Sequence, residues 1–526
     1  MEQAEDKILK LPESVQSFEK IRTQGFIYVD KTDYVWKVAN GKQCNFLGRP
    51  RRFGKSLFAD TLKCYFEGRK DLFKDLKIMN LEHDWVKRQV FKFDFSGCET
   101  ADALYDHISG KLTEYESIYG NSVYKNLNDR FLSLMEKAYV KTGQMVAVIV
   151  DEYDAPLQHT LFKEEEHDKL VVIYRSFFPA LKEGDKYLKC LFLTGITKYT
   201  SLSLFSTLNN VSILGHLSDY AEAIGLTGQE ILDNFQPYLK AMAEKKGTTV
   251  EQVMSELKDM YDGYHFSDDS TKEIYNPFSV IHALADKDIA NYWIASGASQ
   301  LLNDLLKRKD MRGVDLDNCY LSKNELQLND VSKTNTKLFL YQAGYLTINY
   351  FDDDAKRYYL RIPNKEVRET MFEIVLPYAV DYEENDVKGA IGRMQDALMA
   401  DDIPELFENL KQLVSETPYI TGIGDKNKLY ERDFRFILRC SLYLCGCSID
   451  EEKQTSKGRI DIVAHYKDII LLLELKLDNS GGLEAAKQQI IDNNYASAFS
   501  AENKKVYSVA ISFNTESRSI SGYEII

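Results

Sequence analysis

Residues 44–66 read CNFLGRPRRFGKSLFADTLKCYF, and this stretch decides the fold of the first part of the chain. Its apolar start predicts a strand, the residues from Arg49 to Gly54 predict a turn, and the remainder predicts a helix. Strand, turn and helix in this order are the context in which a phosphate-binding loop occurs, because amide groups at the helix start face phosphate oxygens. The stretch therefore predicts a P-loop in an α/β domain.

The side chains of this turn suit a nucleotide that carries a magnesium ion. We expect Gly54 to let the main chain approach phosphate closely and Lys55 to reach the terminal phosphates. The Ser56 hydroxyl is then a magnesium ligand at the helix start. Arg51 and Arg52 add positive charge around a polyphosphate. These residues predict ATP and Mg²⁺ as cofactors.

One position departs from the usual frame of such a loop. A GxxxxGKS motif that ends at Ser56 places Arg49 where the first glycine is expected, and Gly48 lies one position too early. The arginines also fit a solvated basic turn, which remains the alternative to nucleotide binding.

A second apolar strand ends abruptly in carboxylates. The segment MVAVIVDEYDAPL, residues 145–157, continues from a buried strand into Asp151 and Glu152. Ligands of open α/β folds bind at the carboxyl ends of the strands. We expect Asp151 to hold magnesium through water and Glu152 to orient or deprotonate the attacking water. A solvated loop after a buried strand is the alternative interpretation.

A third strand, LKCLFLTGITKYT at residues 188–200, also ends in polar side chains. Thr194, Thr197 and Lys198 are expected to contact the γ-phosphate from a neighbouring strand end. A plain strand exit would show similar residues, so this assignment depends on the P-loop.

The apolar runs define three regions of the chain. Alternating strand and helix patterns predict a parallel sheet covered by helices, with strands at 44–48, 91–95, 145–150 and 188–196. We therefore expect an α/β fold with a P-loop NTPase domain over residues 1–215. Helical patterns dominate residues 216–400, where Thr227 to Glu230 fits a capping box. A further α/β domain is expected over residues 401–526.

Composition restricts the function classes. Of the 526 residues, 44% are hydrophobic and 28% are charged, as in ordinary globular proteins. No apolar run approaches the roughly 20 residues of a membrane span, and no signal segment is evident at the start, so we expect no membrane contact and a cytoplasmic location. The formal charge of −15 argues against indiscriminate coating of nucleic acid, so such binding needs a local basic surface. The oligomeric state stays open.

Residues 457–478 form a second chemical motif, KGRIDIVAHYKDIILLLELKLD. If Lys467 and Asp468 form a two-residue turn, the antiparallel register places Asp461 opposite Glu474. Period-two alternation places Lys476 beside Glu474. Two opposed carboxylates repel each other unless a cation lies between them. The hairpin therefore predicts a magnesium site, with a salt-bridged exposed hairpin as the alternative.

In the mechanism that such a site supports, Asp461 and Glu474 hold the ion and the ion polarises a scissile phosphate. Lys476 helps to lower the pKa of the attacking water. The predicted reaction is cleavage of a phosphodiester.

Two resemblances extend these expectations. Residues 8–215, with RPRRFGKSL, VIVDEYDAPL and LTGITK, resemble the bacterial AAA-ATPase-like proteins that carry a nuclease-like C-terminal region. In that family an arginine at the first P-loop glycine is familiar. The phrases YDGYHFS at 261–267 and YNPFSV at 275–280 resemble it too, and we expect Tyr264, His265 and Phe266 to be packing or turn residues.

Residues 405–515 resemble PD-(D/E)XK nuclease-like domains, whose fold is that of restriction endonucleases. The likeness covers the GRID sequence that ends at Asp461, the Glu-Leu-Lys sequence from Glu474 to Lys476, and the helix that follows. It implies three accessory site residues: Glu431, Gln489 and Tyr495.

Two functions follow from these expectations. The first is an enzyme in which ATP binding or hydrolysis controls a magnesium-dependent nuclease that acts on DNA or RNA. The second is a nucleotide-switched module that binds nucleic acid or protein without cutting. The three residues of the hairpin favour the first, and the acidic charge and incomplete P-loop frame favour the second.

Overall fold

The computed structural model describes residues 8–161, 163–199, 211–267, 272–293, 302–303, 306, 319–328, 336–380, 382–415, 431–455, 458–500 and 502–526. The chain divides into two compact units. The first comprises Met1–Leu301 with Lys307–Arg368, and the second comprises Leu302–Leu306 with Glu369–Ile526. The division after Arg368 falls within helix α17, Lys365–Val380.

The first unit contains a five-stranded sheet in the order β2-β3-β4-β1-β5, and all its pairings are parallel. The strands are β1 Cys44–Gly48, β2 Val90–Asp94, β3 Val146–Asp151, β4 Leu188–Gly195 and β5 Ser212–Ile213. All six residues of β3 are buried. Continuous apolar runs of this kind are typical of parallel strands covered on both faces, and four of these strands were predicted from them.

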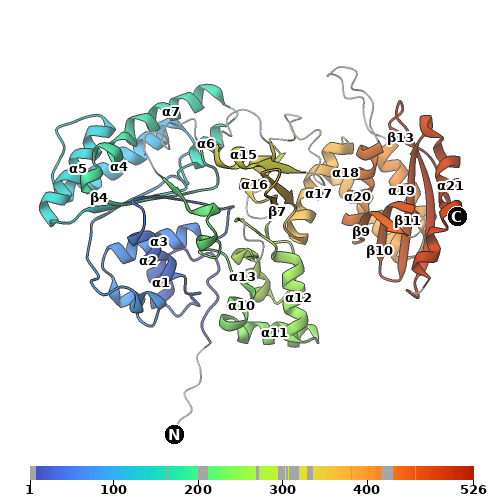
Figure 1. The fold of residues 1–526 in the computed structure, drawn as a ribbon, viewed down its shortest axis with the longest axis horizontal. Coiled ribbons are helices and arrows are strands. Elements are labelled where there is room, and N and C mark those ends of the chain that lie inside the picture. Colours follow the sequence, from blue (N-terminus) through green and yellow to red (C-terminus); the bar gives the residue numbers. More distant parts are fainter. Residues whose placement is uncertain are drawn as a thin grey trace, which may run out of the picture. The chain divides into compact units, whose positions relative to one another are not determined.

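Helices cover both faces of this sheet (Figure 1). One face carries α1 Phe18–Thr23, α2 Thr32–Asn40 and α3 Lys55–Phe66. The other carries α4 Ala101–Tyr119, α5 Leu127–Thr142 and α7 Glu164–Phe177. Helix α3 follows β1 directly, so the connecting loop lies at the carboxyl edge of the sheet. The predicted α/β architecture is confirmed.

A helical group follows the sheet within the same unit. It consists of α10 Gly228–Asn234, α11 Gln236–Lys246, α12 Val250–Tyr261 and α13 Pro277–Asp286. These helices share an apolar core that includes Leu239, Leu257 and Leu284. Helix α10 begins at Thr227 with the predicted capping box, in which Thr227 and Glu230 bind each other's backbone amides.

The first unit also contains a small sheet that the helical patterns did not indicate. Its strands are β6 Tyr320–Ser322, β7 Thr347–Asp352 and β8 Arg357–Arg361, in the antiparallel order β6-β8-β7. Helices α15 Lys323–Leu328 and α16 Thr336–Ala343 accompany it. The strands are short and none is a continuous buried run, but the aromatic and β-branched residues of β7 and β8, on either side of the turn at residues 353–356, are a hairpin signal that the helical prediction for this region missed.

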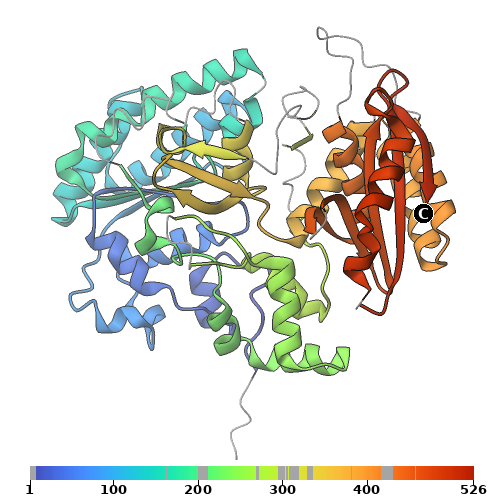
Figure 2. The same cartoon turned by 45° about the vertical axis from the view of Figure 1, so that its right-hand side comes forward.

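The second unit is built on a mixed five-stranded sheet in the order β13-β12-β11-β10-β9. Its strands are β9 Ser448–Thr455, β10 Gly458–Tyr466, β11 Ile469–Leu477, β12 Lys505–Asn514 and β13 Ser519–Ile525. Strands β11 and β12 are parallel, and the other neighbours are antiparallel. Figures 1 and 2 place α21 on one face of this sheet and α19 and α20 on the other.

The helices of the second unit after α17 are α18 Glu384–Met399, α19 Ile403–Ser415, α20 Glu431–Leu444 and α21 Gly482–Asn493. Helix α21 packs on β10, β11 and β12 through a core that includes Ala486 and Ile490. Across the described parts of both units, every helix is too short or too polar to traverse a lipid bilayer.

Candidate functional site

The turn between β1 and α3 places a glycine at the start of a helix, as the predicted P-loop requires. Gly54 is the N-cap of α3, and its φ of 94° lies in the left-handed region that favours glycine. Lys55 and Ser56 therefore begin the helix, where free amide groups are available to an anion. This local geometry explains why a glycine precedes the lysine.

Lys55 lies between the loop and the acids at the end of β3. Its Nζ donates to the carbonyl oxygens of Arg49 at 3.0 Å and Pro50 at 2.8 Å. Burial lowers the pKa of Lys55, and the charges of Glu152, Asp154 and Asp151 oppose that shift. The structure thus brings the predicted lysine and the predicted acids into electrostatic contact.

Thr194 at the end of β4 is hydrogen-bonded to both predicted acids. Its hydroxyl donates to Asp151 Oδ1 and accepts from the Glu152 amide at 3.1 Å. Glu152 adopts a φ of 47°, in the left-handed region, which turns the chain sharply at the strand end. Asp151, Glu152 and Thr194 therefore form one contiguous polar group at the carboxyl edge of β3 and β4.

Asp154 fixes this group to the segment after β4. It is buried and accepts hydrogen bonds from the amides of Ile196 at 2.9 Å and Thr197 at 2.6 Å. Burial raises the pKa of Asp154 to about 6, against the effect of the Thr197 amide. The Tyr153 hydroxyl donates to the Thr197 carbonyl at 2.7 Å. Asp154 and Tyr153 thus position the two strand ends.

Arg49 occupies the position of the expected first glycine. Its side chain is buried, so it does not serve as a flexible loop residue. Its guanidinium donates to the carbonyls of Gly215 and Gly48, and it lies 4.1 Å from the centre of the Phe266 ring. Burial lowers its pKa to about 10. The arginine therefore fastens the P-loop base to the segment after β5. The departure from the glycine frame marked this position in the sequence, but it did not indicate the contact with Gly215.

Two aromatic residues of the YDGYHFS segment pack against Phe53, in the middle of the loop. Phe53 is buried, and its ring lies edge-on to Tyr264 and Phe266 at centroid distances of 4.9 and 5.5 Å. The expectation that Tyr264 and Phe266 pack is consistent with these contacts. The sequence did not indicate that they pack against the P-loop itself.

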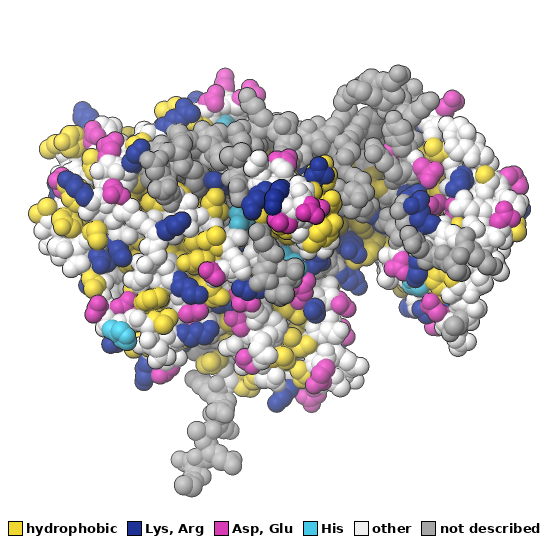
Figure 3. Space-filling model, viewed as in Figure 1, with side chains coloured by type: hydrophobic (Ala, Val, Ile, Leu, Met, Phe, Trp, Pro, Cys, Tyr) yellow, Lys and Arg dark blue, Asp and Glu magenta, His cyan; other side chains and the backbone are white. Residues whose placement is uncertain are grey.

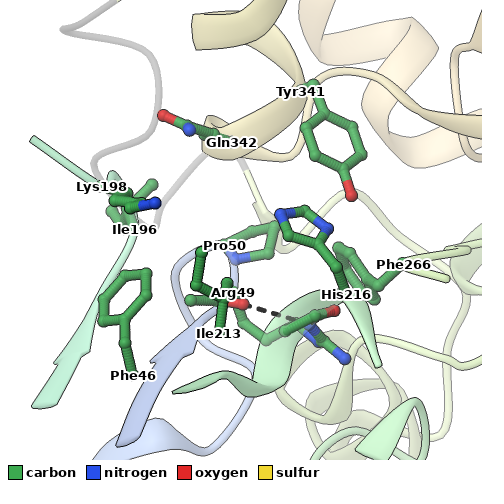
Figure 4. A pocket seen from close by; sticks show the side chains of 12 residues that line it. Phe46, Arg49, Pro50, Ile196, Lys198, Ile213, His216, Phe266, Tyr341 and Gln342 are labelled. Atoms are coloured by element: carbon green, nitrogen blue, oxygen red, sulfur yellow. Dashed lines mark hydrogen bonds between the residues drawn. The ribbon is translucent and has the colours of Figure 1, made fainter. Parts of the chain in front are cut away.

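The other predicted nucleotide-site residues lie around the same edge. Arg52 is exposed and lies over the Phe278 ring at 4.8 Å, and Arg51 is half-buried. Lys198 lines a small cavity with Pro50, and Figure 4 shows it with His216 and Tyr341 around that space. Burial lowers the pKa of Lys198.

The C-terminal hairpin has the predicted register. Tyr466 pairs with Ile469 across the two-residue turn at Lys467 and Asp468, and the ladder continues to Ile462 and Leu473. Main-chain pairing ends there, one residue before Asp461 and Glu474. The strands separate at the position of the two carboxylates.

Asp461, Glu474 and Lys476 converge at this separation. Asp461 Oδ2 accepts the Leu475 amide at 2.9 Å, and Lys476 Nζ donates to Glu474 Oε1 at 3.0 Å. Burial raises the pKa of Glu474 to about 7, and the negative charge of Asp461 adds to this shift. For Lys476, burial is outweighed by the hydrogen bond and charge of Glu474, so its pKa is raised.

This arrangement fits a magnesium ion. Glu474 Oε2 is buried without a hydrogen-bond partner, and it lies in a group where two carboxylates interact. Magnesium is commonly bound by one or two carboxylates and retains several waters. Among the described residues no cluster of three or more acidic, histidine or cysteine side chains is placed to hold a metal, and the hairpin offers two carboxylates, Asp461 and Glu474.

Helix α20 contributes a residue that the motifs did not indicate. Arg435 Nη2 lies 3.1 Å from Glu431 Oε1 and 3.3 Å from Asp461 Oδ1. The predicted accessory residue Glu431 therefore reaches the carboxylate pair through Arg435. The only sequence signal was a Glu-to-Arg spacing of four on a helix, which is common on ordinary surfaces.

Gln489 is hydrogen-bonded to Tyr495, which is in turn hydrogen-bonded to β10. The Tyr495 hydroxyl accepts from Gln489 at 3.1 Å and from Asn493 at 3.0 Å, and it donates to the Arg459 carbonyl at 2.8 Å. Tyr495 is buried, so this network anchors the strand that carries Asp461.

Comparison with known proteins agrees with this division of the chain. Residues 12–205 match the family model described as "Predicted AAA-ATPase". Residues 430–522 match the model described as "PD-(D/E)XK nuclease superfamily". The chain therefore combines an AAA-ATPase-like domain with a PD-(D/E)XK nuclease superfamily domain.

One relative is similar to this chain over nearly the whole length of both proteins. Over 523 residues the chain is 29% identical to a protein of Azotobacter chroococcum mcd 1 described as "Uncharacterized protein in vnfD 5'region". The alignment covers 98% of each chain, so the similarity spans both matched regions.

Proposed function

We propose that this protein binds ATP with Mg²⁺ at its P-loop and uses the C-terminal unit as a magnesium-dependent nuclease on DNA or RNA. One observation carries the nuclease proposal: Asp461, Glu474 and Lys476 converge where β10 and β11 separate. Acidic ligands beside a lysine suit metal-assisted hydrolysis of a phosphodiester.

In the nuclease site each side chain has a distinct task. Asp461 and Glu474 would hold the ion, and the Leu475 amide keeps Asp461 turned toward β11. A bound magnesium ion supplies Lewis-acid polarisation of the phosphate and lowers the pKa of a water. Lys476, held by Glu474, would place its positive charge beside that water.

In the nucleotide site, phosphate binding would draw Lys55 from the Arg49 and Pro50 carbonyls, because an ammonium group bonds more strongly to a charged oxygen. Ser56 and Asp151 would bind Mg²⁺, directly and through water. Glu152 would orient or deprotonate the attacking water, with Thr194 holding its backbone. Lys198, Arg51 and Arg52 are proposed phosphate contacts.

A second function is a nucleotide-switched module that binds nucleic acid or protein without cleavage. Arg435 and Lys476 already neutralise Asp461 and Glu474, which is what a non-catalytic hairpin requires. On the face seen in Figure 3, Lys and Arg side chains are interspersed with Asp and Glu. That surface suits a localised contact more than a general nucleic-acid coat.

The two functions are separated by incubating the full chain with end-labelled DNA and RNA. Magnesium and ATP are each present or absent, and Asp461→Asn is the matched variant. Cleavage that needs magnesium and disappears in Asp461→Asn supports the nuclease. Retention of the labelled strand on the protein without cleavage supports the binding module. The ATP dependence of either signal measures the coupling between the two halves.

A further inference from the structure

Arg435 joins the helix and the strand at the candidate metal site. Its Nη2 atom contacts Glu431 on the same helix and Asp461 on β10, at 3.1 and 3.3 Å. The Arg435 side chain is only 17% exposed, and that of Asp461 is 8% exposed. An ion pair shielded to this degree is weakened less by water than a surface pair.

The two oxygens of Asp461 have different partners. Oδ2 accepts the backbone amide of Leu475, whereas Oδ1 accepts the guanidinium of Arg435. The amide is fixed by the strand, but the guanidinium is on a side chain that can rotate. A cation that coordinates Asp461 therefore competes with Arg435 for Oδ1.

Glu431 provides Arg435 with a second partner that does not depend on Asp461. It lies one helical turn before Arg435, in the spacing that favours ion pairs on a helix. If Arg435 leaves Asp461, Glu431 still holds the guanidinium beside the site. The donor released from Asp461 is then available to a phosphate oxygen, and a planar guanidinium binds phosphate oxygens well.

We propose that Arg435 exchanges Asp461 for a phosphate oxygen of the nucleic acid when a divalent cation binds. Arg435 is thus a positioning residue that weakens metal binding to the free protein and links it to substrate binding. This inference rests on the proposed metal-dependent function of the hairpin. By thermodynamic linkage, metal and nucleic acid then strengthen each other's binding.

The first test measures metal binding alone. Isothermal titration of the nucleotide-free full chain with Mg²⁺ compares wild type with Arg435→Gln, which removes the competing charge. We expect Arg435→Gln to bind Mg²⁺ about fivefold more tightly, at the lower end of typical coupling effects. A variant with a merely damaged site would bind less tightly, so this direction separates exchange from a structural role.

The control is Arg393→Gln, which changes the net charge equally. Arg393 lies on α18 and donates to the Asn409 side chain at 3.0 Å. We expect wild-type Mg²⁺ affinity in this control. Equal tightening in both variants, or no tightening in Arg435→Gln with an unchanged melting temperature, would overturn the proposed exchange.

The second test measures retention of a labelled oligonucleotide with and without Ca²⁺, an oxygen-binding divalent probe. Wild type should bind more tightly when Ca²⁺ is present, and Arg435→Gln should lose most of this increase. Arg435→Lys should restore part of it, because lysine keeps the charge without the planar fork. Equal increases in wild type and Arg435→Gln would overturn the proposal.

Asp461→Asn distinguishes failure of the inference from failure of the function. If wild type and Asp461→Asn bind Mg²⁺ equally, the hairpin is not the metal site and both proposals fail. If Asp461→Asn alone weakens binding and Arg435→Gln has no effect, only the role of Arg435 is wrong.

Discussion

The guanidinium of Arg49 donates a hydrogen bond to the backbone carbonyl of Gly215, across the base of the P-loop. Replacement by glycine would complete the usual P-loop frame, yet it would leave buried carbonyl groups without a donor. We expect Arg49→Gly to lower the free energy of unfolding of the first unit by about 2–4 kcal/mol. Urea denaturation monitored by circular dichroism measures this change.

The matched control for that substitution is Arg52→Gly in the same loop. Arg52 is exposed and has a φ of 71°, a conformation that glycine adopts without strain. We expect a change within about 0.5–1 kcal/mol, because relief of backbone strain offsets the lost contact with Phe278. An Arg49→Gly protein as stable as Arg52→Gly would contradict the anchoring role.

Lys55→Ala should weaken nucleotide binding by about tenfold to a hundredfold, the effect of losing a hydrogen bond from a charged donor. Titration with a fluorescent ATP analogue and Mg²⁺ measures the affinity. Lys63→Ala is the control, because Lys63 lies on the same helix and pairs with Glu67 at 2.9 Å. If Lys55→Ala binds nucleotide with wild-type affinity, the P-loop is not the nucleotide site.

Lys476→Ala should reduce nuclease cleavage by about a hundredfold or more, which is the usual contribution of assisted proton transfer. The measurement is the initial rate on an end-labelled oligonucleotide at saturating Mg²⁺. Lys487→Ala serves as the control, since Lys487 is paired with Glu524 on α21 and β13. Cleavage that persists unchanged in Lys476→Ala would point to a contaminating nuclease.

Stability should depend on pH through Glu474, whose pKa is raised to about 7 by burial and by Asp461. A carboxyl with a raised folded-state pKa is favoured in its neutral form. Compared with a residue that is always neutral, Glu474 therefore loses its contribution to stability as the pH rises from about 4, near its pKa in the unfolded chain, to about 7, its pKa in the folded chain. Without metal, Glu474→Gln should gain stability relative to wild type over this window, by on the order of 3 kcal/mol at most.

Melting temperatures of wild type and Glu474→Gln at pH 5 and pH 8, in the presence of a chelator, measure the effect. Comparison of the two proteins cancels the other carboxyl groups that titrate in both. A difference that is the same at both pH values would show that Glu474 does not titrate in this range.

Tyr495→Phe should destabilise the second unit by about 1–2 kcal/mol, because it leaves Gln489, Asn493 and the Arg459 carbonyl without a shared partner. Tyr507→Phe is the control, as the Tyr507 hydroxyl contacts Asp401 near the surface. Urea denaturation compares the two. An equal, small loss in both variants would exclude a special supporting role for Tyr495.

The local parts of this structure could be predicted from sequence because their signals are local. The strand expected at residues 44–48 is β1, and the two-residue turn at Lys467 and Asp468 gave the register of the hairpin. Apolar periodicity and turn length determine such features within a few residues. The convergence of Asp461 with Lys476 followed from that register.

The supporting contacts could not be predicted, because they join distant positions. Arg49 binds a carbonyl 166 residues away, and Arg435 meets a carboxylate 26 residues away on a different element. Neither residue differs in type from an ordinary surface arginine. The packing of Phe266 against the P-loop likewise depends on tertiary structure that periodicity does not encode.

The turn at Lys467 restricts the sequence changes that the hairpin can tolerate. Lys467 adopts a φ of 47°, and with Asp468 it reverses the chain in two residues. A single inserted residue that shifted the pairing would send alternate side chains to the opposite side of the sheet, and the two carboxylates would no longer meet. The hairpin tip is therefore expected to vary in residue type but not in length, although no chemistry takes place there.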